Sequence, residues 1–168
     1  MKNRIAKKVC AAALAGLMTM ALVPTSVFAA GTMTIGVTSF ADTLEPTEQY
    51  FSWVISRYGV GQGLTRFDEE GNMVPCLATE WTNSEDGKTW TFTIREGVKF
   101  SNGNDMTPEL VKASLERTIE MSNRVPEFFD IDSIEVDGQN IIFNLNRANA
   151  NMAGCLADPL FLIMDTSI

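Results

Sequence analysis

The sequence predicts a mixed α/β fold, because two kinds of apolar periodicity alternate along it. Residues 89–95 alternate apolar and polar side chains, the pattern of a half-buried β-strand. The residues after Thr107 follow a helix start signal and repeat apolar side chains with a helical period. Residues 131–136 and 140–145 are two strand-like runs around a glycine-containing turn. We therefore expect one modest mixed α/β domain.

Residues 1–29 are predicted to be a secretory signal peptide. Basic residues precede an apolar run over Val9–Val23, and Val27-Phe28-Ala29 supplies the small residues that a signal peptidase needs, with cleavage expected after Ala29. The run of about 15 residues is shorter than the roughly 20 of a membrane-spanning helix. Cys10 lies at the start of this run, directly after Lys7-Lys8-Val9, whereas a lipid-anchored cysteine follows such a run. Residues 30–168 are then the exported domain.

The exported part is expected to begin with a strand and a helix. Thr32–Val37 alternates with the period of a strand. Thr47 is predicted to cap a helix over Glu48–Tyr58, which Gly59 ends in a left-handed conformation. Leu64–Phe67 is a further strand-like run. The apolar face predicted for the helix consists of Tyr50, Phe51, Val54, Ile55 and Tyr58.

The segment Asp86–Gly103 is the best-defined strand of the chain, with a turn at each end. We expect Trp90, Phe92, Ile94 and Phe100 to be core residues, each contributing roughly 2–3 kcal/mol for a large side chain. We predict no strand in the residues between Leu64–Phe67 and this segment.

The second half of the chain is predicted as a helix, a hairpin and a final strand. Thr107-Pro108-Glu109 combines a cap, a first-turn proline and a first-turn acid, so a helix should run from there to Ser122-Asn123. Ile131–Leu145 should form a hairpin around Asp137-Gly138-Gln139. Asn146–Ala157 reads as a loop with a short helix, and Leu160–Met164 as a buried strand.

The charge of the exported part excludes several classes of partner. Four of the 13 basic residues and none of the 21 acidic residues lie in the signal segment, so the remainder has a formal net charge of −12. This balance disfavours nucleic acid and anionic membranes, which need basic patches. A soluble exported protein fits it better.

Metal and cofactor chemistry is not predicted. The chain has no histidine, the commonest metal ligand and general base. The acidic cluster over Glu127–Glu135 lacks the spacing of a calcium loop. The glycines of Gly59–Gly63 follow a helix, whereas a dinucleotide-binding loop follows a strand. Cys76 and Cys155 are allowed to pair after export, although two small apolar side chains are the alternative.

Several segments of the chain resemble, in one order, the family 5 extracytoplasmic solute-binding proteins, which are peptide- and nickel-binding receptors of ABC importers. The resemblance covers nearly all of the exported part. The segments are Asp42–Pro46, Gly63–Asp68, Val74–Trp81, Asp86–Arg95, Val98–Gly103, Thr107–Lys112 and Ser114–Arg117.

This resemblance implies a two-lobed fold of the type II periplasmic-binding-protein kind that closes over its ligand. The chain then looks like the N-terminal part of such a protein: residues 30–168 would be part of lobe I with its inserted subdomain, without the second lobe. It implies no enzyme activity and no cofactor. The implied partners are a small peptide or metal-chelate ligand and an ABC permease in the membrane, and the protein would be a monomer in the periplasm or at the cell exterior.

The resemblance also implies where a ligand would lie. In the family, the segment after the first strand and the start of the next helix reach the cleft, which corresponds here to residues 40–54. The ligand-binding candidates are Gln49, Tyr50, Phe51, Trp53 and Phe128. Aromatic side chains in such a cleft cover the apolar part of a ligand. The alternative for Tyr50, Phe51 and Phe128 is packing in the core.

Three functional questions stay open from the sequence. Oligopeptide and nickel chelate are both possible ligands, because the wording shared with the nickel branch, residues 84–93 and 100–103, belongs to the scaffold. A ligand-presenting module for a sensor or partner protein is the alternative to transport. A secreted hydrolase is disfavoured, since the chain has no histidine and no nucleophile-elbow motif.

Overall fold

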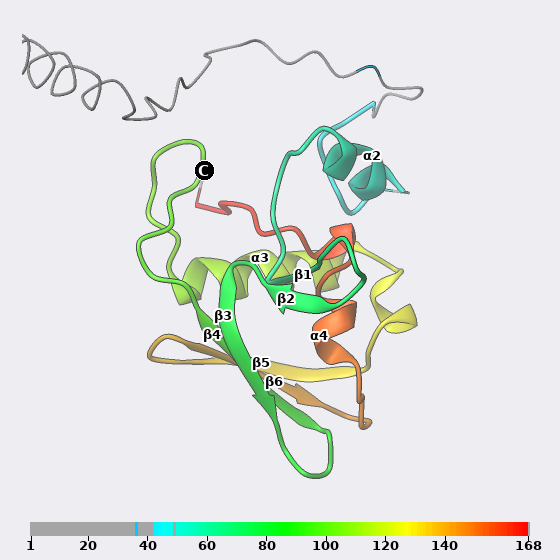
Figure 1. The fold of residues 1–168 in the computed structure, drawn as a ribbon, viewed down its shortest axis with the longest axis vertical. Helices are drawn as coiled ribbons and strands as arrows, with labels where there is room; N and C mark the ends of the chain where they lie inside the picture. Colours follow the sequence, from blue (N-terminus) through cyan, green and yellow to red (C-terminus); the bar gives the residue numbers. More distant parts are fainter. Residues whose placement is uncertain (1–35, 37–41, 49, 168) are drawn as a thin grey trace, which may run out of the picture. The chain divides into compact units, whose positions relative to one another are not determined.

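A four-stranded antiparallel sheet forms the centre of the fold, with the strands in the order β3-β4-β6-β5 (Figure 1). The computed structural model describes residues 36, 42–48 and 50–167, so the predicted signal peptide and nearly all of the strand predicted at Thr32–Val37 lie outside the described residues. The strands of the large sheet are β3 (Ala78–Asn83), β4 (Thr89–Ile94), β5 (Ile131–Asp137) and β6 (Asn140–Leu145). A separate hairpin pairs β1 (Thr65–Phe67) with β2 (Met73–Pro75).

The register of β4 against β6 aligns the large apolar side chains on one face of the sheet. Trp90 lies opposite Phe143, and Phe92 lies opposite Ile141. Phe92, Ile141 and Phe143 are fully buried, and the rings of Phe92 and Phe143 meet edge to face with 5.5 Å between centroids. The sequence prediction of a half-buried strand is confirmed, because burial along β4 alternates residue by residue. Phe100, also predicted as core, is half-buried and packs against the edge of this cluster.

Helix α3 (Pro108–Met121) covers this inner face of the sheet, against β5 and β6. Its predicted start is confirmed, since the Thr107 hydroxyl accepts a hydrogen bond from the Leu110 amide at 3.4 Å. Val111 and Leu115 point into the core and are fully buried. The helix ends at Met121 with Ser122 as its cap residue, close to the predicted end at Ser122-Asn123.

Helix α2 (Phe51–Arg57) is shorter than predicted and buries a different face. The prediction of a helix from Glu48 capped by Thr47 was wrong, because the Glu45 carboxylate binds both the amide and the hydroxyl of Thr47, at 3.0 and 2.6 Å. The helix begins at Phe51, three residues later than predicted, with Tyr50 at its cap position. Of its residues, Ser52 and Ile55 are the buried ones, so the predicted face is only partly correct. Gly59 follows the helix with φ of 73°, as expected.

The strand predicted at Leu160–Met164 was also wrong, although most of these residues are buried as expected. Pro159–Phe161 forms a 3₁₀ turn, η2, in which the Asp158 carboxylate accepts a hydrogen bond from the Leu160 amide at 2.9 Å. The backbone amides of the residues that follow donate hydrogen bonds to separate partners and not to one neighbouring strand. The Ile163 amide donates to the Gln62 carbonyl and the Met164 amide to the Ser114 hydroxyl, both at 2.9 Å.

The remaining elements agree with the sequence analysis except between residues 73 and 83. The hairpin β5–β6 turns at Gly138, whose φ is 55°. The short helix expected in the loop is α4 (Met152–Cys155), and the Thr65 hydroxyl fastens it to β1 by donating to the Ala153 carbonyl at 2.6 Å. Strands β2 and β3 were not predicted. Cys76 and Cys155 are both free and half-buried.

Replacing Phe143 by Ala tests whether the β4–β6 register holds the core together. We expect this change to lower the free energy of unfolding by about 3–5 kcal/mol, because a fully buried ring is lost and a cavity is left. Urea denaturation followed by tryptophan fluorescence measures it. The matched control is Thr91→Ala on the opposite face of β4, which should change the free energy by less than about 1 kcal/mol. Equal effects would contradict the assignment of the two faces.

Candidate functional site

The segment around α2 presents aromatic side chains at the surface. Tyr50 is 67% exposed and Trp53 is 48% exposed, whereas Phe51 is half-buried. Packing in the core, the alternative considered for Tyr50, does not describe so exposed a ring. Gln49, the remaining candidate of this segment, lies outside the described residues.

The structure brings together two of the candidates that are far apart in the sequence. The guanidinium carbon of Arg124 lies 4.6 Å from the centre of the Tyr50 ring and 5.8 Å from the centre of the Phe128 ring. A cation this close to aromatic rings is attracted by their negative faces. Tyr50, Arg124 and Phe128 thus form one cluster, which we call the arginine–aromatic cluster.

Arg124 brings hydrogen-bond donors that the described residues leave without an acceptor. Its Nε and Nη1 atoms are buried and have no hydrogen-bond partner there. The carboxylate of Glu127 lies 3.9 Å from Nε, which is beyond hydrogen-bond distance. A buried donor without a partner costs about 1–3 kcal/mol. The cluster therefore has an unmet requirement for an acceptor.

Sequence reasoning missed Arg124. It predicted Tyr50 and Phe128 as separate candidates, and no local pattern links them to the arginine that lies just before Pro126. The one available signal was chemical: a single basic residue between a helix end and an aromatic pair in an acidic chain. That signal identifies neither the residues that contact Arg124 nor the extent to which Arg124 is buried, because both depend on the fold.

A network of hydrogen bonds holds Phe128 in place at the end of the 3₁₀ turn η1 (Val125–Glu127). Its carbonyl accepts from Asn149 Nδ2 at 3.1 Å and from Cys155 Sγ at 3.4 Å. The Asn149 carbonyl in turn accepts from the indole nitrogen of Trp90 at 3.0 Å. Burial raises the pKa of the Cys155 thiol, so it stays protonated and donates. Phe128 is thereby connected to the central strand β4.

The ring of Phe128 also packs against the chain that follows α4. It meets the fully buried Phe161 of η2 edge to face, with 5.2 Å between centroids. Packing, the alternative considered for Phe128, accordingly describes one side of this half-buried ring, and Arg124 lies by the same ring. The side chain joins the core to the arginine–aromatic cluster.

An ion pair fastens the segment before α2 to helix α3. The Arg117 guanidinium donates to both oxygens of the Glu45 carboxylate, at 3.1 and 2.5 Å. The side chain of Glu45 is 17% exposed and that of Arg117 is 33% exposed. Arg117, together with Thr47, lowers the pKa of Glu45 to about 2. The carboxylate is therefore charged throughout the neutral and mildly acidic range.

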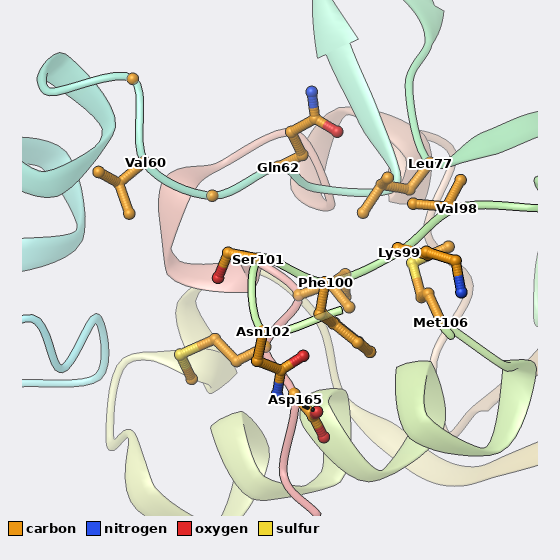
Figure 2. Close-up of a pocket in the computed structure, with 14 residues that line it drawn as sticks. Val60, Gln62, Leu77, Val98, Lys99, Phe100, Ser101, Asn102, Met106 and Asp165 are labelled. Atoms are coloured by element: carbon orange, nitrogen blue, oxygen red, sulfur yellow. Dashed lines mark hydrogen bonds between the residues drawn. The ribbon is translucent and has the colours of Figure 1, made fainter. Parts of the chain in front are cut away.

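A cavity of about 610 Å³ is lined by residues other than the sequence-predicted ligand-binding candidates (Figure 2). Val60 and Gln62 line one side of it, and the loop carrying Phe100, Ser101 and Asn102 lines another. The charged groups at this cavity already have partners in the chain. Lys99 pairs with Asp105, and the Asp165 carboxylate accepts from the amides of Asn102 and Asn104 at 2.8 and 2.7 Å.

These hydrogen bonds lower the pKa of Asp165 and leave its charge satisfied. The cavity is consequently a mostly apolar hollow, whereas the arginine–aromatic cluster has donors to offer. We take the cluster as the candidate functional site.

Three further properties concern the part of the chain that the structure describes. It contains no group of three or more cysteine and acidic side chains arranged to hold a metal ion. In the acidic cluster over Glu127–Glu135, Glu127, Asp132 and Glu135 are exposed, and Asp130 pairs with Arg147 at 3.0 Å. None of the helices in that part has the length and apolarity that crossing a membrane requires.

Comparisons with known proteins agree with the fold. Residues 72–167 match the family model of bacterial extracellular solute-binding proteins, family 5 Middle. The nickel-binding periplasmic protein of Escherichia coli K12 is 42% identical over 65 residues, which cover 39% of this chain and 12% of that protein. The glutathione-binding protein GsiB of Escherichia coli O6:K15:H31 is 34% identical over 110 residues, covering 64% of this chain and 21% of that protein.

A solved structure supports the same conclusion. The nickel ABC transporter protein from Bacillus halodurans superposes with a TM-score of 0.69 and 35% identity, covering 74% of this chain and 26% of that chain. The mixed α/β fold is thus that of part of a solute-binding protein. The chain belongs to the bacterial extracellular solute-binding proteins of family 5. It spans only about an eighth to a quarter of the length of these relatives.

Replacing Glu45 by Gln tests the ion pair through its pH dependence. The folded pKa of about 2 lies below the ordinary value of 4.5, so the carboxylate stabilises the fold fully above pH 4.5 and loses this effect as the pH falls toward 2. We expect Glu45→Gln to lower the free energy of unfolding by about 1–2 kcal/mol at neutral pH. The difference from the unchanged chain should shrink steadily below pH 4.5 and vanish near pH 2.

Urea denaturation at a series of pH values measures this difference. Glu116→Gln is the matched control, because Glu116 forms an exposed pair with Lys112 at 3.6 Å on the same helix. Its effect should stay below about 0.5 kcal/mol at every pH. A Glu45→Gln effect that persists undiminished to pH 2 would contradict the role given to the ion pair.

Proposed function

We propose that this chain is part of an extracytoplasmic solute-binding protein of an ABC importer. Such a protein captures an oligopeptide or a nickel chelate and delivers it to a permease in the membrane. Membership of family 5 supports the proposal, as do relatives described as nickel-binding and glutathione-binding. The signal segment at residues 1–29 supports export to the periplasm or the cell exterior. The protein would act as a monomer.

Residues 30–168 would form the N-terminal part of lobe I, with a second lobe closing over the ligand. Closure of two lobes buries a ligand between surfaces that are each open on their own. Exposed Tyr50 and Trp53 fit this arrangement, because rings that face solvent in one lobe become covered when the lobes meet. Phe51 and Phe128 would support the same surface from below, and Gln49 would lie beside it.

The unmet donors of Arg124 carry the proposal of a binding site at the arginine–aromatic cluster. A guanidinium binds carboxylates in a planar, two-bonded geometry. Tyr50 and Phe128 would contact the apolar part of the same ligand. A peptide and an amino-acid chelate of nickel share a carboxylate, so this chemistry suits both ligand classes. We propose that the ligand presents that carboxylate to Arg124.

Calorimetry with matched probes on the complete product of the gene tests this function. The probes are trialanine, trialanine amide and the nickel(II) complex of L-histidine. We expect trialanine or the nickel(II) complex of L-histidine to bind, because both carry a carboxylate. Arg124→Gln should weaken that binding at least about tenfold, the loss expected for one hydrogen bond to a charged group. Trialanine amide should bind no better than the Arg124→Gln variant binds trialanine.

Arg147→Gln is the control, since Arg147 is a largely exposed arginine that is paired with Asp130. It should leave binding within twofold of the unchanged protein. If neither trialanine nor the nickel(II) complex of L-histidine binds, the proposed function is overturned. Binding that Arg124→Gln leaves unchanged would overturn the proposed site.

A further inference from the structure

Helix α2, which follows Tyr50, packs against η2 and buries Ser52 and Ile55. Two further contacts attach Tyr50 and the residues before it to the rest of the fold. One is the contact of the Tyr50 ring with Arg124, and the other is the ion pair of Glu45 with Arg117. Arg117 lies on α3, and Arg124 follows three residues after that helix ends at Met121. Both attachments therefore lead to the same half of one helix.

Burial of Tyr50 does not hold this segment in place. The ring is 67% exposed, and Tyr50 makes no side-chain cap for α2. Residues 42–48 before it contain no helix or strand. The position of Tyr50 over Arg124 therefore depends on the packing of α2 after it and on contacts made by the residues before it.

The carboxylate of Glu45 is suited to that task. Its two oxygens accept four hydrogen bonds: two from the Arg117 guanidinium, and one each from the amide and hydroxyl of Thr47. A two-bonded pairing of guanidinium and carboxylate fixes orientation as well as distance. Arg117 itself is carried by a helix of 14 residues whose inner face is fully buried. Glu45 thus transmits the position of α3 to the chain five residues before Tyr50.

We propose that Glu45 and Arg117 are positioning residues, which hold Tyr50 above Arg124 before a ligand arrives. This inference rests on the proposed function of the arginine–aromatic cluster. Fixing Glu45 keeps Tyr50 close to Arg124, which raises the effective concentration of the ring at the arginine. A ligand then meets an aromatic ring that is already in place and does not have to order the segment. Neither Glu45 nor Arg117 needs to touch the ligand.

Hydrogen exchange of the ligand-free protein tests the positioning directly. In the complete product of the gene, Glu45→Gln should speed exchange of the amides of residues 50–58 by about tenfold, the change expected when hydrogen bonds to a charged group are lost. The amides of α3 and of β4 should exchange as in the unchanged protein. Glu116→Gln, which removes the other carboxylate paired on α3, should leave residues 50–58 unaffected.

A double-mutant cycle tests whether the effect on binding passes through Arg124. With the probe that binds, trialanine or the nickel(II) complex of L-histidine, Glu45→Gln should weaken binding about 3- to 10-fold, mainly through a slower association rate. In the Arg124→Gln background the same change should have less than a twofold effect. A merely structural role would give the same loss in both backgrounds.

The outcomes separate the two proposals. If neither probe binds the unchanged protein, the proposed function fails, and the exchange of residues 50–58 still decides whether Glu45 positions this segment. If a probe binds and the losses from Glu45→Gln and Arg124→Gln simply add, the positioning role is overturned while the function stands. Unchanged exchange of residues 50–58 in Glu45→Gln would overturn the positioning role in either case.

Discussion

The packing of α3 on the inner face of the sheet is the interaction on which the candidate site depends. Val111 and Leu115 lock the helix onto the core that Phe92 and Phe143 form. Both halves of the site are carried by this helix. Arg124 and Phe128 follow directly from its end, and Arg117 reaches from it to the segment that bears Tyr50. A change in the packing of this helix would therefore affect both halves of the site.

The parts of the fold that were predicted correctly are those in which neighbours along the chain decide the structure. The alternation of Trp90, Phe92 and Ile94 fixes a strand with one buried face whatever lies opposite it. Thr107 and Pro108 begin a helix through bonds within one turn. The hairpin at Gly138 depends on a turn that its own residues form. The resemblance of the same segments to family 5 identified the class of protein correctly.

The errors and omissions share a different physical cause. In each of them, contacts with residues distant in the sequence, or in the preceding turn, replace the local interactions on which the prediction relied. Thr47 was predicted as a helix cap, but its hydroxyl donates a hydrogen bond to the Glu45 carboxylate. Glu45 is in turn bound by Arg117, which lies 72 residues away in the sequence. Leu160–Met164 is apolar enough for a buried strand, yet its amides bind Gln62 and Ser114 singly. Arg124 became a candidate only because the fold places it between two rings from separate segments.

The arginine–aromatic cluster shows why binding and stability make different demands on the same residue. The rings of Tyr50 and Phe128 attract the cation, but they offer its N–H groups no lone pair comparable to a carboxylate oxygen. Glu127 is too distant for a hydrogen bond to Nε. The donors therefore cost stability as long as they stay buried without an acceptor. In the complex that we propose, a ligand carboxylate would remove this cost, so the unsatisfied arginine would favour the bound state.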